Sequence, residues 1–346
     1  MTERAIDLRS DTLTLPTEEM LRSMATARLG DDSRDGDPTV VELEHLAASM
    51  LGKEAALLTV SGTMSNLVAL RTHAEPGACA IVEETAHLYG MELGGIAAAA
   101  SLLVLPVPGF RGAMNLDGLR VALRKAAAGF PARGVVCLED THNGAGGTIV
   151  AADHLARCAE LAHGHGVPVH LDGARIFNAA VALAVDVKEL TRHVDSVSMC
   201  LSKGLSAPVG SLLAGPAAFI DRARKVRRAL GGTMRQAGVL AAPGIVALQT
   251  MIPRLIEDHR HARILARRVA EIPGLRVDLD GVQTNIVNVD VRDLAIDGAT
   301  FVKHMEAAGV RGLANFGTGV RLVTYRGITE EHVLAAARTL EVLIEA

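Results

Sequence analysis

The chain has 346 residues, of which 49% are hydrophobic and 21% are charged, and its formal net charge at pH 7 is −4. This composition indicates a globular protein with a large core and excludes an intrinsically disordered chain. The mildly acidic balance disfavours nucleic-acid binding, and the sequence lacks a run of about 18 uninterrupted apolar residues that would predict a membrane span. We therefore expect neither a nucleic acid nor a membrane as a partner.

The cysteines and the N-terminal residues indicate the compartment. Cys79, Cys137, Cys158 and Cys200 fall in no paired spacing, so the sequence predicts neither a disulfide framework nor a zinc site, and no metal is expected. The N-terminal residues MTERAIDLRSD have no apolar segment of the kind found in a signal peptide. A cytoplasmic location is the natural expectation.

Short apolar runs alternate with amphipathic stretches from residue 55 to residue 201. We expect the stretches between most of the runs to be helices and the runs themselves to be strands, at 55–60, 78–82, 101–107, 134–139, 167–171 and 196–201. Strands that are almost continuously apolar and alternate with helices predict an α/β fold with a largely parallel sheet covered on both faces.

The pattern changes after this region. A long helix-like segment at 235–271 precedes a predicted strand at 284–291, a helix at 298–309, a strand at 319–325 and a final helix at 329–345. This order predicts a smaller C-terminal α/β domain. We place the large domain, with an N-terminal arm, at residues 1–245 and the small domain at 246–346.

Ligands bind outside the carboxyl ends of the strands in a parallel sheet, so the residues that follow each run are candidates for a site. The turn of Ser61, Gly62 and Thr63 precedes a helix and offers amides and hydroxyls to a phosphate, although an ordinary helix cap has the same pattern. Lys203 lies between Ser202 and Gly204 after the run at 196–201. It is either a solvated loop lysine or a desolvated amine that forms a Schiff base.

Two further strand ends carry informative side chains. Asp172 and Arg175 follow the run at 167–171 and could form a simple ion pair in a loop, and His87 could be a structural histidine. Considered together with Lys203 and the turn at 61–63, they match one cofactor. Pyridoxal phosphate (PLP) needs a carboxylate at its pyridine nitrogen, amides at its phosphate, a group stacked on its ring and an amine at its aldehyde. The sequence therefore predicts PLP linked to Lys203.

Several longer motifs point to a known family. They occur in the order LRSDTLTLPTEEM, GDDSRDGDPTVVELE, SGTMSN, EDTHNGAGG, VHLDGARIFNAA, CLSKGLSAPVGS, GGTMRQAG and VRLVTY. In order and spacing they resemble the low-specificity L-threonine aldolases of the aromatic amino acid β-eliminating lyase family, which are PLP-dependent enzymes of fold type I. The resemblance covers nearly the whole chain. It implies a carbon–carbon lyase that cleaves L-threonine or L-allo-threonine type substrates to glycine and an aldehyde, in a homotetramer of two dimers with shared active sites.

The resemblance also implies roles for individual residues. Lys203 would carry the cofactor, Asp172 would pair with the pyridine nitrogen, and His87 would stack on the ring near the substrate hydroxyl. We expect His87 to act as the general base there, either directly or through a water molecule. The residues that match cofactor contacts are Gly62, Thr63, His87, Asp172, Arg175, Ser202, Lys203, Arg228 and Arg235. The residues assigned to the substrate are Ser10, Arg34, Arg175 and Arg321.

Some positions depart from the family pattern and leave the substrate open. Arg34 stands where a tyrosine is usual at the pocket edge, Gly129 where a histidine is usual, and Arg228 where a lysine often reaches the phosphate of a neighbouring subunit. The same set of cofactor-binding residues could also serve β-elimination or racemisation, or a protein that binds PLP without catalysing a reaction. The presence of Lys203 and Asp172 argues against the last of these.

Overall fold

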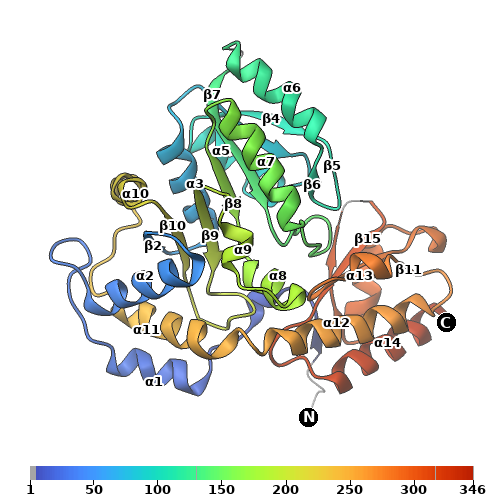
Figure 1. Cartoon of the computed structure of the whole chain (residues 1–346). Helices are drawn as coiled ribbons and strands as arrows, with labels where there is room; N and C mark the ends of the chain where they lie inside the picture. The colour runs from blue at the N-terminus through green and yellow to red at the C-terminus, as the bar shows by residue number, and fades with distance from the viewer. Residues whose placement is uncertain (1–4, 130, 316, 346) are drawn as a thin grey trace. The chain divides into compact units, whose positions relative to one another are not determined.

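The structure is a computed structural model that describes residues 5–129, 131–315 and 317–345. By their internal contacts, these residues form two compact units (Figure 1). The larger unit comprises residues 15–145 and 149–252, and the smaller unit comprises the described residues up to Thr14, the segment Gly146–Thr148 and the chain from Pro253 onward. The contacts thus divide the chain after Ile252 and group the N-terminal arm with the smaller unit. The domain boundary at 245/246 remains a prediction about independent domains.

The larger unit contains a seven-stranded sheet that is parallel except for one strand. From one edge to the other its strands are β2 (Ala55–Thr59), β10 (Ser211–Gly215), β9 (Ser196–Cys200), β8 (Val169–Asp172), β7 (Ala132–Glu139), β3 (Ala78–Glu83) and β4 (Leu103–Val107). Strand β10 runs antiparallel to both of its neighbours. The six strands predicted in this region are confirmed, whereas β10 was missed. The mainly parallel α/β fold is confirmed as well.

Helices cover this sheet on both faces. On one face lie α3 (Gly62–His73), α5 (Gly95–Ala98) and α10 (Ala217–Ala229), and on the other lie α2 (Pro38–Leu51), α6 (Leu116–Ala127), α7 (Ala152–Gly164) and α9 (Lys188–Thr191). Because both faces are covered, residues at the centre of the sheet such as Ile81, Val136 and Leu171 are completely buried. The unit also contains α1 (Glu18–Thr26), α4 (His87–Gly90), α8 (Ile176–Leu183), α11 (Gly238–Val246) and a hairpin of β5 (Gly109–Phe110) and β6 (Ala113–Met114).

Local sequence explains where these helices begin and end. Helix α2 begins after Asp37, whose carboxylate accepts hydrogen bonds from the amides of Thr39 and Val40, and it ends at Gly52 in the left-handed conformation, with φ of 63°. Helix α7 ends at Gly164, and the chain enters β8 through the exposed Gly166, with φ of 69°. Glycine adopts this backbone conformation without the strain that a side chain would introduce.

The smaller unit contains a four-stranded antiparallel sheet with helices packed on it. The strands are β11 (Arg276–Val277), β12 (Ile286–Asp290), β15 (Gly319–Val323) and β14 (Leu313–Ala314), and the helices are α12 (Leu255–Ala270), α13 (Gly298–Ala307) and α14 (Glu330–Glu345). Strand β1 (Ile6–Asp7) pairs in parallel with β13 (Val310–Arg311). The two strands and two helices predicted between 284 and 345 are confirmed.

The helix-like segment at 235–271 is not one helix. Helix α11 is followed by a π-helical turn at Ala247–Met251, and α12 begins only after Pro253. Proline has no amide hydrogen to donate to the preceding turn, so it interrupts the hydrogen-bond ladder. Among the described residues no single helix is long and apolar enough to cross a membrane.

Candidate active site

The carboxyl ends of the parallel strands place the predicted residues at one edge of the large sheet. Glu139, the last residue of β7, is paired with Asp172, the last residue of β8. His87 follows the neighbouring strand β3, and Lys203 follows β9 on the other side. The predicted residues His87, Asp172 and Lys203 thus come from the ends of three strands, and Glu139 of β7, which was not predicted, lies among them.

Asp172 is buried, and each of its carboxylate oxygens accepts a hydrogen bond. Its side chain accepts from Nδ2 of Asn66 at 2.8 Å and from the amide of Ala174 at 3.1 Å, and the residue is 3% exposed. Burial raises the pKa of Asp172, but the positive charges of His87 and Lys203 and the bond from Asn66 outweigh it and hold the pKa below its ordinary value. An ionised carboxylate is the group that keeps a pyridine nitrogen protonated.

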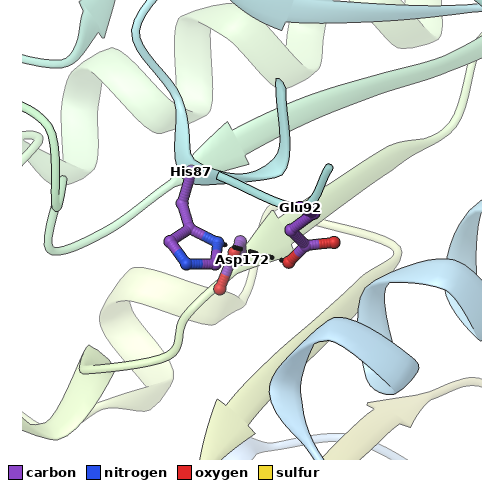
Figure 2. A group of neighbouring side chains, drawn as sticks. All are labelled: His87, Glu92 and Asp172. Atoms are coloured by element: carbon purple, nitrogen blue, oxygen red, sulfur yellow. Dashed lines mark hydrogen bonds and ion pairs between the residues drawn. The ribbon is translucent and has the colours of Figure 1, made fainter. Parts of the chain in front are cut away.

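His87 lies against two carboxylates (Figure 2). Its Nδ1 is 3.2 Å from Oε1 of Glu92, and the nearest ligating atoms of His87, Glu92 and Asp172 lie within 4.8 Å of one another. Burial lowers the pKa of His87, whereas the bond to Glu92 and the charges of Asp172 and Glu139 raise it, so that the net shift is upward. The spacing would also suit a metal ion, but an amide already donates to both carboxylates.

That amide belongs to Asn66, which was not identified from the sequence. Its Nδ2 donates to Oε1 of Glu92 at 2.9 Å as well as to Asp172. Its Oδ1 accepts from the Ser198 hydroxyl at 2.8 Å and lies 3.1 Å from Nε2 of His170. Because the hydroxyl points at one end of the amide and two carboxylates lie at the other, the network fixes which end carries oxygen. Asn66 is the last residue of the SGTMSN motif, and its place in this motif is the sequence feature that could have identified it.

The first turn of α3 provides donors for a phosphate. Ser61 caps the helix by accepting from the amide of Met64, and the amides of Gly62 and Thr63 have no hydrogen-bond partner in the part of the chain that the structure describes. A side chain at Gly62 would place its Cβ 2.8 Å from Sγ of Cys200, at the end of β9. This close approach requires glycine.

Lys203 lies half-buried in the loop between β9 and β10, next to the half-buried Ser202. The amide of Ser206 donates to the carbonyl of Lys203 at 2.9 Å, and Ser206 itself has a φ of 67°, so a tight turn holds the lysine backbone. With the ionised Asp172 and the two amides of α3, the lysine completes a donor set that fits PLP.

Arg175 is connected to the cluster through Glu139. Nη1 of Arg175 donates to Oδ1 of Asn143 at 3.2 Å, and the amide of Asn143 donates to Oε1 of Glu139 at 2.6 Å. The other oxygen of Glu139 accepts from the backbone amide of His87 at 2.6 Å. Glu139 therefore positions segments that follow β3 and β7, and the sequence did not reveal this role.

Three predicted arginines lie on the surface of the larger unit. Arg228 is exposed at the end of α10. Arg34 and Arg235 have side chains that are 79% and 64% exposed, and both approach the carboxylate of Asp31, at 3.7 and 3.9 Å. The buried arginine of α10 is instead Arg227, described below.

Ser10 and Arg321 belong to the smaller unit. The Ser10 hydroxyl accepts from the amide of Thr12 at 3.2 Å, and Arg321 is half-buried on β15 opposite Asn288 of β12. Gly129, in the larger unit, precedes the amino end of β7, whereas Glu139 ends that strand. The eight residues of β7 span about 25 Å, so within its own chain Gly129 is remote from Asp172.

Comparisons with known proteins agree with this geometry. A family model described as beta-eliminating lyase matches residues 7–292. The chain is 39% identical over 338 residues to low-specificity L-threonine aldolase 1 of Arabidopsis thaliana, covering 96% of this chain and 94% of that protein. It is 40% identical over 333 residues to the low specificity L-threonine aldolase of Escherichia coli K12, covering 96% and 97%. The solved structure of Leishmania major threonine aldolase matches with a TM-score of 0.83 at 18% identity, covering 98% and 99%.

Proposed function

The chain belongs to the beta-eliminating lyase family, and on this premise we propose that it cleaves β-hydroxy-α-amino acids of the L-threonine type into glycine and an aldehyde. It is a PLP-dependent carbon–carbon lyase that acts on a small amino-acid substrate. The observation that carries the proposal is the buried, ionised Asp172 beside His87 and Lys203. These groups are the ones that PLP chemistry on an amino acid requires.

When bound, PLP supplies an electron sink for the negative charge that forms at Cα after bond cleavage. Lys203 holds the cofactor's aldehyde end, and the amides of Gly62 and Thr63 hold its phosphate at the start of α3. Asp172 keeps a proton on the pyridine nitrogen, because its own pKa is held low. His87 accepts the proton of the substrate's β-hydroxyl, which allows the bond between Cα and Cβ to break.

Further residues select the substrate in this proposal. Ser10 and Arg321 bind its carboxylate, since an arginine pairs with a carboxylate through two parallel hydrogen bonds. Arg175 contributes from the larger unit, where it is 6% exposed. Arg34 lies at the pocket edge, and Ser202 stands beside Lys203 as a further cofactor contact.

The proposal extends to assembly and location. We infer a homotetramer of two dimers in the cytoplasm, in which Arg228 and Arg235 bind the cofactor phosphate of a neighbouring subunit. Their exposure on the isolated chain supports this role, because a guanidinium that reaches another subunit has to project from its own.

A substrate panel tests the proposal. The purified protein is incubated with PLP and with threonine, allo-threonine, phenylserine or 3-hydroxyaspartate, and glycine and aldehyde are measured. We expect the two products in equal amounts. Pyruvate with ammonia would instead indicate β-elimination, the D-amino acid would indicate racemisation, and bound PLP without any product would indicate a binding module.

A further inference from the structure

The segment that follows His87 inverts the usual distribution of polar and apolar residues. In the sequence Met-Glu-Leu, Met91 and Leu93 are 57% and 97% exposed, while Glu92 between them is only 6% exposed. The backbone enforces this arrangement, because Leu93 and Gly94 adopt consecutive left-handed conformations, with φ of 52° and 75°. Burying a carboxylate between two exposed apolar side chains is unfavourable unless specific partners hold it.

The partners of Glu92 are both hydrogen-bond donors. Its Oε1 lies 3.2 Å from Nδ1 of His87 (Figure 2). The same oxygen accepts from Nδ2 of Asn66 at 2.9 Å. An ionised carboxylate can only accept hydrogen bonds, so Nδ1 of His87 has to carry the hydrogen. In the neutral imidazole the basic nitrogen is then Nε2. Among the described residues Nε2 has no hydrogen-bond partner.

We propose that Glu92 is the positioning residue of His87, which holds the imidazole with its hydrogen on Nδ1 and thereby makes Nε2 the nitrogen that accepts the substrate's proton. The inference rests on the proposed function, in which His87 is the base. Asn66 makes the arrangement rigid, because one amide nitrogen binds both Glu92 and Asp172. Asn66 thus connects Glu92, which positions the base, to the carboxylate predicted to bind the cofactor.

The charged groups around His87 give the pH dependence that follows. Glu92 faces it from the segment between α4 and α5, Asp172 from β8 and Glu139 from β7, and Lys203 and His142 lie beyond these carboxylates. Burial lowers the pKa of His87, and the three carboxylates raise it above its ordinary value. A base with a raised pKa is protonated and inactive at low pH. Removing the charge of Glu92 should therefore lower that pKa and extend the active range to lower pH.

The test compares Glu92→Gln with Glu84→Gln, the same chemical change at an exposed position of the same connection. Nitrogen NMR of the PLP-loaded protein reports the tautomer and titration of His87, with His87→Asn identifying its signals. We expect Glu92→Gln to move this titration to lower pH by about one unit. The acid limb of kcat/KM should move with it, and kcat should fall by about tenfold to a hundredfold, the loss typical of residues that orient a functional imidazole. Glu92→Asp retains the charge and should restore the titration in part.

The outcomes separate this inference from the proposed function. An unchanged His87 titration in Glu92→Gln, whatever the loss of activity, would show that Glu92 is merely structural. If Glu92→Gln does not fold, wild-type protein decides, because a neutral His87 with its hydrogen on Nε2 would overturn the inference. A wild type that produces no glycine, but whose His87 signals shift in Glu92→Gln, would refute the lyase function and leave the positioning role intact.

Discussion

Asn66 donates to Oδ2 of Asp172 across 2.8 Å, although the two residues are 106 positions apart in the sequence. Both side chains are buried, at 1% and 3% exposure, so the bond is shielded from competing water. The bond orients the carboxylate of Asp172, which is proposed to pair with the pyridine nitrogen of the cofactor. Helix α3 thereby connects the turn proposed to bind the phosphate to the strand end proposed to bind the pyridine nitrogen.

Replacing Asn66 with alanine should destabilise the protein by about 3 kcal/mol, because it removes one hydrogen bond from each of four buried groups, those of Ser198, His170, Glu92 and Asp172. The matched control is Asn115→Ala, which removes only an exposed helix cap and should cost about 1 kcal/mol. Chemical denaturation of both variants measures the difference. Equal losses would show that the buried network contributes no more than a surface cap.

Lys203 should carry the cofactor. Borohydride reduction of the PLP-loaded protein followed by peptide mapping should place the pyridoxyl group on Lys203, and Lys203→Ala should lose the yellow colour because it lacks the amine. Lys225→Ala, an exposed lysine on α10, serves as the control and should retain it. A label on Lys53, Lys125 or Lys225 would overturn the assignment.

Asp32→Asn should be strongly destabilising. Arg227 donates to Asp32 at 2.7 Å and to the carbonyl of Leu58 at 2.7 Å, and the side chains of the pair are 1% and 4% exposed. Loss of one partner leaves a buried charge uncompensated and typically costs about 3 kcal/mol or more. Glu42→Gln breaks the exposed pair with Arg28 and should cost about 1 kcal/mol at most. Similar midpoints of urea unfolding for the two variants would contradict this expectation.

Arg228→Ala should weaken cofactor retention, because the arginine is proposed to bind the phosphate of a neighbouring subunit. Dialysis followed by absorbance of the remaining PLP measures the effect, and Lys225→Ala on the same helix should bind as tightly as the wild type. Unchanged retention in Arg228→Ala, together with a monomeric mass in solution, would refute the shared site.

Arg34 should favour acidic substrates. If its guanidinium faces the pocket of the assembled protein, 3-hydroxyaspartate should gain in kcat/KM relative to threonine, and Arg34→Tyr should reverse that gain. The effect of such an exposed cation should be modest, about 1 kcal/mol at most. Arg22→Tyr, an exposed change on α1, provides the control. The same substrate ratio in wild type and Arg34→Tyr would place Arg34 outside the pocket.

Hydrophobic patterning predicted the strands and helices whose apolar residues are buried. It failed where the surrounding structure, and not the residue type, decides which side chains are buried. The sequence SLLAG, which forms β10, follows Pro208 and Gly210, and these residues indicate a loop. The strand was therefore not predicted. Residue type predicts that Glu92 is exposed and that the flanking Met91 and Leu93 are buried, whereas the structure shows the reverse. Arg227 and Arg228 are chemically equivalent in sequence, yet adjacent helix positions point about 100° apart, so only the packed structure shows which one is buried.

The site residues were predicted from strand ends because the carboxyl ends of parallel strands meet at one edge. Asp172, Lys203 and His87 follow that rule. Asn66 and Glu139 hold other site residues in place through hydrogen bonds. These bonds depend on distances between segments that are far apart in the sequence, so the sequence did not predict them. Gly129 shows a limit of predictions from resemblance. The family pattern drew attention to this position, but it does not show which end of a strand the residue lies near.

The turn between α7 and β8 has a practical use. A Cβ added at Gly164 would meet no atom within 4 Å, and the residue is exposed, whereas Gly166 has a left-handed conformation that a side chain would strain. Gly164 ends α7 and precedes the amino end of β8, whereas Asp172 is the last residue of that strand, at the opposite edge of the sheet. A peptide tag or a tether to a solid support placed there leaves the catalytic edge facing the solution. The position is therefore an attachment point for an immobilised catalyst.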